Sequence, residues 1–194
     1  MFQGLPSRPP AHQSVGGFCF MNLNLQSSDF EIFGVEARFA LDRNALDARW
    51  KDLQREAHPD RFATADAQAQ RQAMQWSVRI NEAYQRLKDP LKRAAYLCEL
   101  HGAPIEAESN TAMPSDFLMQ QMEWREQLDD ASGLAALEQL ADEVAAARRR
   151  MVETLRVTAD EQRDYPALAR QVRALMFVER FARDVELRLD QQGQ

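Results

Sequence analysis

Two runs of apolar residues at helical spacing, separated by the tripeptide His58-Pro59-Asp60, constrain the fold of this 194-residue chain more than any other feature. Each run has the period expected for one buried face of a helix. Pro59 ends the first helix, because proline excludes the preceding residue from the α region. A loop at 61–66 follows, so the two helices can pack as an antiparallel hairpin with the tripeptide at its tip. The first run is Leu46, Trp50, Leu53 and Ala57, and the second is Ala69, Ala73, Trp76, Ile80, Ala83, Tyr84 and Leu87.

A stretch rich in Gly, Pro, Ser and Asn, from His101 to Pro114, divides the chain into unlike halves. Gly102 stands where a helix would stop. Residues 21–101 hold twelve acidic and twelve basic side chains, whereas residues 102–194 hold eighteen and eleven. This acidic balance argues against a nucleic-acid partner and favours a basic or mixed protein surface. The predicted division is a tail at 1–25, a first domain at 26–101, a linker at 102–114 and a second domain at 115–194.

The start of the chain and its cysteines bear on location and cofactors. Residues 1–20 lack the apolar core of a signal peptide, and we interpret them as a disordered tail or as a start assigned too far upstream. Cys19 and Cys98 are far apart and show no metal-ligand spacing with any histidine. We therefore expect no disulfide, no metal and no bound cofactor, and a cytoplasmic location. No window holds the roughly 20 apolar residues of a membrane span, so no membrane partner is expected.

Three further amphipathic helices are predicted in the second half. Ser115 or Asp116 can cap the first and Ser132 the second, while Thr158 with Glu161 forms a capping-box pattern before the third. Three apolar stripes must bury one another, so we predict an antiparallel three-helix bundle and an all-α chain. The stripes are Phe117, Gln121, Trp124 and Leu128; Leu134, Leu137, Leu140, Ala141, Val144, Arg148, Met151 and Leu155; and Leu168, Val172, Leu175, Ala182, Val185 and Leu189.

The first of these helices carries more apolar surface than a bundle core requires. Flexible apolar side chains edged by carboxylates are typical of a surface that binds a partner protein. Phe177 and Phe181 on the third helix also lie off its core stripe. They either join a docking surface or pack against a neighbouring element. The extra residues of the first helix are Leu118, Met119 and Met122, with Glu123, Glu126 and Asp130 on the same side.

The residues around the tripeptide resemble a J-domain. The segment 80–87 (INEAYQRL), followed by Asp89-Pro90 and by 92–96 (KRAAY), is similar to the last two J-domain helices almost position by position. The resemblance implies that His58, Pro59 and Asp60 dock on a DnaK-type chaperone and trigger its ATP hydrolysis, so the chain itself is not an enzyme. Physically, Asp60 offers a carboxylate to an arginine fork, and Pro59 limits the loop entropy lost on docking.

Lys51 and Arg55 lie one turn apart, opposite the apolar stripe of the first hairpin helix. They are either an ordinary solvated face or a chaperone contact, since the corresponding helix of J-domains meets an acidic groove through a denser basic face. Asp47 and Asp52 stand where basic residues are frequent, and Ala57 replaces a common tyrosine. These departures leave room for a specialised chaperone.

Over roughly 29–190 the chain resembles the HscB-type co-chaperones of iron-sulfur cluster assembly, in which a J-domain precedes a three-helix bundle. The stretch 117–130 (FLMQQMEWREQLDD) is similar to the segment that binds the scaffold protein IscU, and 97–102 (LCELHG) also resembles this family. The implied partners are IscU and the dedicated chaperone HscA. The implied scaffold contacts are Leu118, Met119, Met122, Glu123, Glu126, Asp130 and Phe177.

Other function classes fit the sequence less well. A general DnaJ-like co-chaperone for protein folding is the nearest alternative, although the Gly/Phe-rich linker and paired-cysteine modules of many such proteins are absent from the sequence. A carrier that itself binds a cluster or haem would need ligands that two distant cysteines cannot supply. A hydrolase built on His58 and Asp60 would lack a nucleophile and an oxyanion site.

Overall fold

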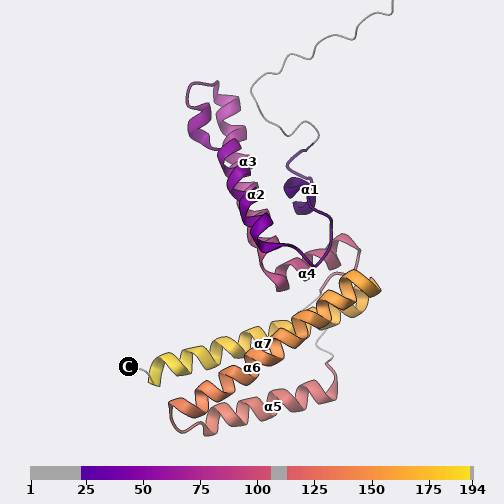
Figure 1. The fold of residues 1–194 in the computed structure, drawn as a ribbon, viewed down its shortest axis with the longest axis vertical. Helices are drawn as coiled ribbons and strands as arrows, with labels where there is room; N and C mark the ends of the chain where they lie inside the picture. The colour runs from indigo at the N-terminus through magenta and orange to yellow at the C-terminus, as the bar shows by residue number, and fades with distance from the viewer. Residues whose placement is uncertain (1–22, 106–112, 193–194) are drawn as a thin grey trace, which may run out of the picture.

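The computed structural model describes residues 23–105 and 113–192, and every regular element within these ranges is helical. In Figure 1, α2 and α3 form an antiparallel hairpin, while α5, α6 and α7 form a bundle that crosses beneath α4. The prediction of an all-α chain, with a hairpin followed by a three-helix bundle, is therefore confirmed. The elements are α1 (Asp29–Phe33), α2 (Arg43–Glu56), the 3-10 helix η1 (Pro59–Phe62), α3 (Ala67–Lys88), α4 (Pro90–Leu100), α5 (Ser115–Asp130), α6 (Leu134–Arg156), the π-helical turn η2 (Val157–Gln162) and α7 (Tyr165–Gln192).

The hairpin of α2 and α3 packs through the predicted apolar stripes. Leu53 and Ile80 are fully buried between the two helices. The ring of Trp50 stacks on Tyr84, with 4.7 Å between ring centroids, and its indole nitrogen donates a hydrogen bond to Asn81 Oδ1 at 3.0 Å. A partly buried indole N–H needs an acceptor. This hydrogen bond therefore avoids the free-energy cost of an unpaired donor where Trp50 packs between the helices.

Asp47, at a position where the J-domains that this sequence resembles often carry a basic residue, belongs to a polar network between α2 and α3. Its Oδ1 accepts hydrogen bonds from the Tyr84 hydroxyl at 2.9 Å and from Arg43 Nε at 2.7 Å. The bond from Tyr84 is the main reason that the pKa of the Asp47 carboxyl lies below its usual value. The acidic residue at this position therefore ties the hairpin together.

α1 is held against α3 by Asp29, whose side chain is fully buried. Asp29 Oδ1 lies 2.6 Å from Arg79 Nη2, and Oδ2 lies 3.2 Å from Arg86 Nη1. The backbone N–H of Asp29 donates to the Tyr96 hydroxyl of α4 at 3.0 Å. The Asp29 side chain thus connects α1 with α3, and the Asp29 backbone N–H connects α1 with α4.

The predicted N-caps, Ser115 or Asp116 for α5 and Ser132 for α6, are wrong. α5 has Pro114 in the N-cap position, and α6 follows Gly133; neither helix has a side-chain cap. Gly133 has a φ of 104°, a conformation that L side chains rarely adopt, so the backbone turn itself sets where α6 begins.

The predicted capping box of Thr158 and Glu161 is also wrong, because both residues lie inside the π-helical turn η2. Thr158 is buried, and its hydroxyl accepts a hydrogen bond from Gln171 Nε2 at 3.0 Å. α7 begins only at Tyr165, where Asp164 Oδ1 accepts a hydrogen bond from the Ala167 N–H at 2.9 Å. The η2 turn therefore delays the third bundle helix by several residues.

The core of the bundle follows the three predicted stripes with two differences. Leu134, predicted to be buried, is 49% exposed at the start of α6. Phe181 is buried, and its ring stacks on Trp124 of α5 with 5.7 Å between centroids. Phe181 is thus a core residue, and its packing against the neighbouring helix is the correct one of the two interpretations.

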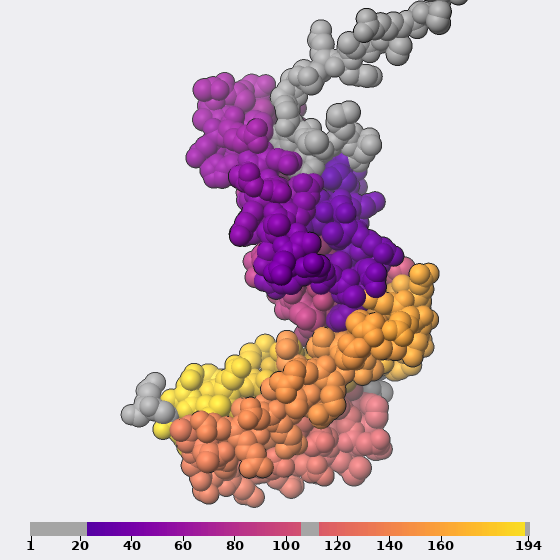
Figure 2. Space-filling model, in the orientation of Figure 1, coloured from indigo at the N-terminus to yellow at the C-terminus, as the bar shows by residue number. Residues whose placement is uncertain are grey.

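The two halves of the chain share one continuous hydrophobic core, which runs from Phe30 to Val185. α4 lies against α7: Cys98 Sγ is 3.8 Å from the Tyr165 carbonyl oxygen, and the His101 ring stacks on the Tyr165 ring at 3.7 Å. Figure 2 shows the two halves in direct contact along this joint.

Cys98, buried at this joint, is expected to resist thiol reagents. Burial raises the pKa of its thiol to about 11, so the group is protonated at pH 8 and its thiolate fraction is about a hundredfold below that of an ordinary cysteine. In a Cys19→Ser chain, absorbance titration with a chromogenic disulfide at pH 8 should show slow modification. The same chain in guanidinium should react fully within minutes; equally fast reaction of the folded chain would contradict the burial.

Candidate functional site

The tripeptide forms a short, structured turn at the end of the hairpin. α2 ends at Glu56, and His58 has an extended backbone, with its Nδ1 accepting the Asp60 N–H at 3.3 Å. Pro59 opens the 3-10 helix η1, whose first turn closes with a hydrogen bond from the Arg61 N–H to the His58 carbonyl at 3.0 Å. Both side chains that could reach a partner remain open to solvent: His58 is 55% and Asp60 is 90% exposed.

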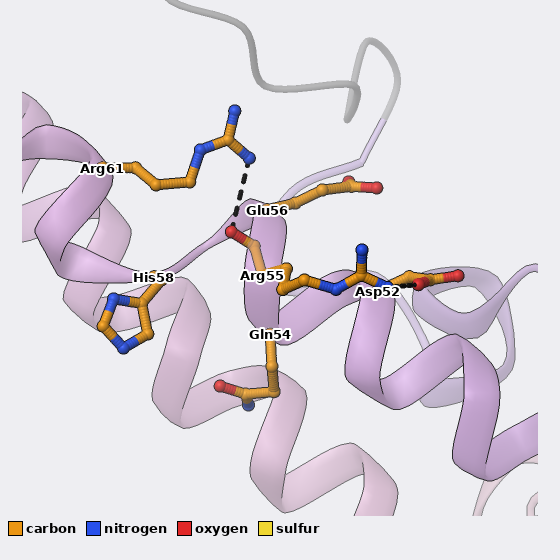
Figure 3. Close-up of a pocket in the computed structure, with 6 residues that line it drawn as sticks. All are labelled: Asp52, Gln54, Arg55, Glu56, His58 and Arg61. Atoms are coloured by element: carbon orange, nitrogen blue, oxygen red, sulfur yellow. Dashed lines mark hydrogen bonds and ion pairs between the residues drawn. The ribbon is translucent and has the colours of Figure 1, made fainter.

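Arg61, which the sequence pattern did not single out, contributes to the same surface. Its Nη1 donates a hydrogen bond to the Arg55 carbonyl at 3.3 Å, which folds the guanidinium back over the end of α2 (Figure 3). Together with His58 and Arg55 it lines a shallow groove along the hairpin tip. Figure 3 shows the His58 ring turned away from this Arg61 contact. No sequence signal beyond its place after the tripeptide marks Arg61.

The predicted basic surface on α2 is present but mixed in charge. Lys51 and Arg55 are both exposed. Arg55 Nη2 pairs with Asp52 Oδ1, and Arg49 Nη1 lies 3.9 Å from Glu56 Oε1. The helix therefore presents cations beside carboxylates. Such a mixed surface attracts acidic proteins weakly in general, and it favours a partner whose charges match it in position.

The bundle has an exposed apolar surface on α5. Leu118, Met119 and Met122 are 48%, 58% and 62% exposed, although all are large apolar side chains. On α7, Phe177 is 40% exposed. These exposed apolar side chains are therefore the candidate surface for a partner.

Packing in the bundle core relates Phe177 to this surface. α5 and α7 run in the same direction, each antiparallel to α6 (Figure 1). The stacking of Trp124 on Phe181 fixes their relative level. Phe177 lies one helical turn before Phe181, and is therefore level with the turn of α5 that carries Met119 and Met122.

The predicted carboxylates also come together. Glu123, Glu126 and Asp130 line one shallow groove between α5 and α6, which Glu143 of α6 also lines. Glu143 Oε1 accepts a hydrogen bond from Trp124 Nε1 at 2.8 Å. The groove edge is acidic, and Glu123 and Glu126 lie one helical turn after Met119 and Met122. This side of the bundle therefore suits a partner with apolar and basic side chains.

The described part of the chain offers no cluster of metal ligands. Within residues 23–105 and 113–192, no group of three or more histidine, cysteine, aspartate or glutamate side chains is placed to hold a metal ion. In the same ranges no helix is both long and apolar enough to cross a membrane.

A helical hairpin with His-Pro-Asp at its tip, joined to a three-helix bundle with an exposed apolar surface, defines a J-domain protein with an appended helical domain. The family model described as "HSCB C-terminal oligomerisation domain" matches residues 113–186. The co-chaperone protein HscB homologue of Bordetella petrii is 51% identical over 80% of this chain and 92% of its own length. The homologue of Burkholderia cenocepacia is 48% identical over 87% of this chain and 97% of its own.

Solved structures agree with these relatives. Chaperone HscB from Vibrio cholerae is 37% identical, with a TM-score of 0.74 over 86% of this chain and 99% of its own. Human co-chaperone protein HscB shares the fold, with a TM-score of 0.81 and 24% identity over 94% of each chain. The chain belongs to the HscB co-chaperone family, which confirms the resemblance found in the sequence.

Proposed function

We propose that this chain binds the iron-sulfur scaffold IscU, delivers it to the DnaK-type chaperone HscA and stimulates the ATPase of HscA during iron-sulfur protein maturation. The chaperone contacts are His58, Pro59 and Asp60, with Lys51 and Arg55 beside them. The scaffold contacts are the apolar residues Leu118, Met119, Met122 and Phe177 and the carboxylates Glu123, Glu126 and Asp130.

The observation that carries this proposal is the presence of two separate exposed surfaces on one body. The His-Pro-Asp tip lies at the far end of the hairpin from the bundle (Figure 1), and the apolar surface of α5 lies on the bundle. An adaptor needs such an arrangement, because the two partners must bind at once without competing. Family membership supports the same assignment.

The mechanism is one of effective concentration. When the bundle holds the scaffold and the tip engages the chaperone, the second contact becomes intramolecular and is strengthened without any new interaction. The chain itself makes and breaks no covalent bond; ATP is hydrolysed on HscA. We place the chaperone-binding domain at 26–101, the linker at 102–114, the scaffold-binding domain at 115–194, and the protein in the cytoplasm.

Steady-state ATP hydrolysis by HscA, measured with this chain and with or without IscU, tests the proposal. We expect stimulation by the chain alone and greater stimulation when IscU is added. Stimulation of a general DnaK but not of HscA would instead favour a general DnaJ-like co-chaperone. No effect on either chaperone would overturn the assignment of the tip.

A Leu118→Ser/Met122→Ser/Phe177→Ser variant is expected to lose scaffold binding while keeping its fold. Each side chain is at least 40% exposed, so the core is unaffected. Loss of a hot-spot residue costs a complex about 2 kcal/mol, so three changes should weaken binding by about a hundredfold or more. Isothermal titration calorimetry with IscU measures this.

The matched control for the triple variant is Met74→Ser/Val78→Ser. These residues are also exposed apolar side chains, 61% and 54%, but they lie on α3. Scaffold affinity should be unchanged in this control. Equal weakening in both variants would mean that general loss of apolar surface, and not the α5/α7 surface, determines binding.

A further inference from the structure

Asp160, in the η2 turn between α6 and α7, reaches out of the bundle and holds the backbone of the J-domain. Its Oδ1 accepts the Phe39 N–H at 2.6 Å, and its Oδ2 accepts the Ala40 N–H at 2.9 Å. Phe39 and Ala40 belong to the segment 34–42, which connects α1 to α2. A carboxylate that takes two successive backbone donors fixes both the distance and the orientation of the segment it holds.

The surroundings of Asp160 make this contact a rigid one. Its side chain is 6% exposed, so water does not compete for the two donors. Arg38 Nε lies 3.7 Å from Oδ2, and the Arg93 guanidinium of α4 lies over the Phe39 ring at 4.8 Å. Burial lowers the pKa of Arg93, while Asp160 and Asp89 act in the opposite direction. Arg38 thus lies beside the carboxylate, and Arg93 interacts with it electrostatically.

The segment that Asp160 holds is itself anchored to the hairpin. Gly34, in the left-handed conformation, ends α1, and Asp42 caps α2 by accepting the Asn44 and Ala45 N–H groups. The direction of α2, and hence the direction in which the His-Pro-Asp tip points, is therefore linked to the η2 turn through a short stretch of anchored backbone.

A second point of attachment lies on α7. Arg173, largely buried, donates from Nη1 to the Ile105 carbonyl at 2.7 Å, just beyond α4. The contact of Tyr165 with Cys98 and His101 lies between Asp160 and Arg173 along the chain. Among these contacts, Asp160 is the one that reaches the α1–α2 side of the J-domain; the others reach α4 or the residues after it.

We infer that Asp160 is a positioning residue that sets the angle between the chaperone-binding tip and the scaffold-binding surface, and so couples scaffold binding to ATPase stimulation. The inference rests on the proposed function, because it assigns a role only if both surfaces are engaged together. Without this carboxylate each half keeps its own helices and its own surface. Loss of the carboxylate removes the fixed orientation of the tip relative to the scaffold-binding surface. That orientation keeps the effective concentration of the bound scaffold at the chaperone high.

The test uses the full chain with the change Asp160→Ala. Glu161→Gln in the same turn is the matched control, because Glu161 pairs within the bundle, with Arg156 at 2.9 Å. Nitroxide labels at Gln85→Cys on α3 and Glu138→Cys on α6, in a Cys19→Ser background, report the distance between the halves by pulsed electron paramagnetic resonance. Stimulation of HscA is measured with and without IscU. Circular dichroism reports folding.

For Asp160→Ala we expect a broadened distance distribution and unchanged stimulation of HscA without IscU. The additional stimulation caused by IscU should fall by about tenfold. Glu161→Gln should match the wild type in all three measurements. If Asp160→Ala loses its helical signal, Asp160→Asn, which keeps one acceptor oxygen, is judged by the same criteria with a smaller expected effect.

Two results would overturn the inference: a distance distribution as narrow as that of Glu161→Gln, or a broadened one with the full additional stimulation by IscU. Failure of the proposed function is recognised separately. In that case IscU gives no additional stimulation even with the wild-type chain, whatever the distance distribution of the variant shows.

Discussion

A His58→Gln variant is expected to fold like the wild type and to lose most of its stimulation of the HscA ATPase. His58 is 55% exposed, and its ring supports the local turn through a hydrogen bond from the Asp60 N–H at 3.3 Å. We expect the variant to lose a hydrogen bond between the His58 ring and a charged group of the chaperone, and such a loss costs about 1.5–3 kcal/mol, which corresponds to about a ten- to hundredfold weaker contact. Stimulation measured over a concentration series of the variant separates weaker docking from a lower maximum.

Thr64→Ala is the control for this change, because Thr64 is exposed in the loop that follows η1. It should stimulate as the wild type does. Binding of IscU by His58→Gln should also be unchanged, since the bundle surface lies far from the tip (Figure 1). Full stimulation by His58→Gln would contradict a chaperone contact at His58 and leave the tripeptide with a structural role at the end of the hairpin.

An Asp29→Ala variant is expected to lose a large part of the free energy of unfolding. The change leaves Arg79 and Arg86 facing a site that held their buried carboxylate, at 2.6 and 3.2 Å. Breaking a buried ion pair by removing one partner costs about 3–5 kcal/mol, and we expect the lower end of this range because Arg79 and Arg86 are themselves 17% and 40% exposed. Since a typical domain is stable by about 5–15 kcal/mol, urea denaturation should show a large fall in the transition midpoint.

Glu31→Ala provides the comparison within the same helix. Glu31 closes the capping box of α1 by accepting the Ser28 N–H at 2.7 Å, but it is exposed to solvent. Loss of a helix cap costs about 1 kcal/mol, so this variant should unfold at a midpoint much nearer the wild type. Equal effects of the two changes would mean that the Asp29 cluster adds nothing beyond the cap.

The helices of this chain could be predicted from its sequence because apolar spacing is a local signal. The stripe through Leu46 and Leu53 and that through Leu168, Val172 and Leu175 are buried as predicted. Helix starts were less predictable. Thr158 with Glu161 fits a capping box as a pattern, yet the chain uses Thr158 inside a π-helical turn and begins α7 at Tyr165.

The contacts of Asp29 and Asp160 could not have been predicted from spacing. Asp29 meets partners 50 and 57 positions away, and Asp160 meets Phe39 at a separation of 121. Neither carboxylate has a local pattern that distinguishes it from a solvated one. Only the packing of α1 on α3, and of η2 on the segment before α2, gives these side chains their partners.

The candidate site was predictable to different degrees in its two parts. The tripeptide is recognised from sequence because it interrupts two apolar runs. Phe177 and Phe181, by contrast, looked equivalent, being one turn apart on one side of α7. Whether such a residue is covered depends on a neighbouring helix: Trp124 covers Phe181, while Phe177 is 40% exposed.

The continuous core from Phe30 to Val185 has a consequence for how the chain folds and unfolds. The sequence changes character after His101, but α4 is buried on two sides: Tyr96 contacts α1, while Cys98 meets Tyr165 of the bundle. The change in composition after His101 therefore does not mark the edge of a separate hydrophobic core. We therefore expect the two halves to unfold as one cooperative unit, and a fragment ending near residue 101 to leave part of its interior facing water.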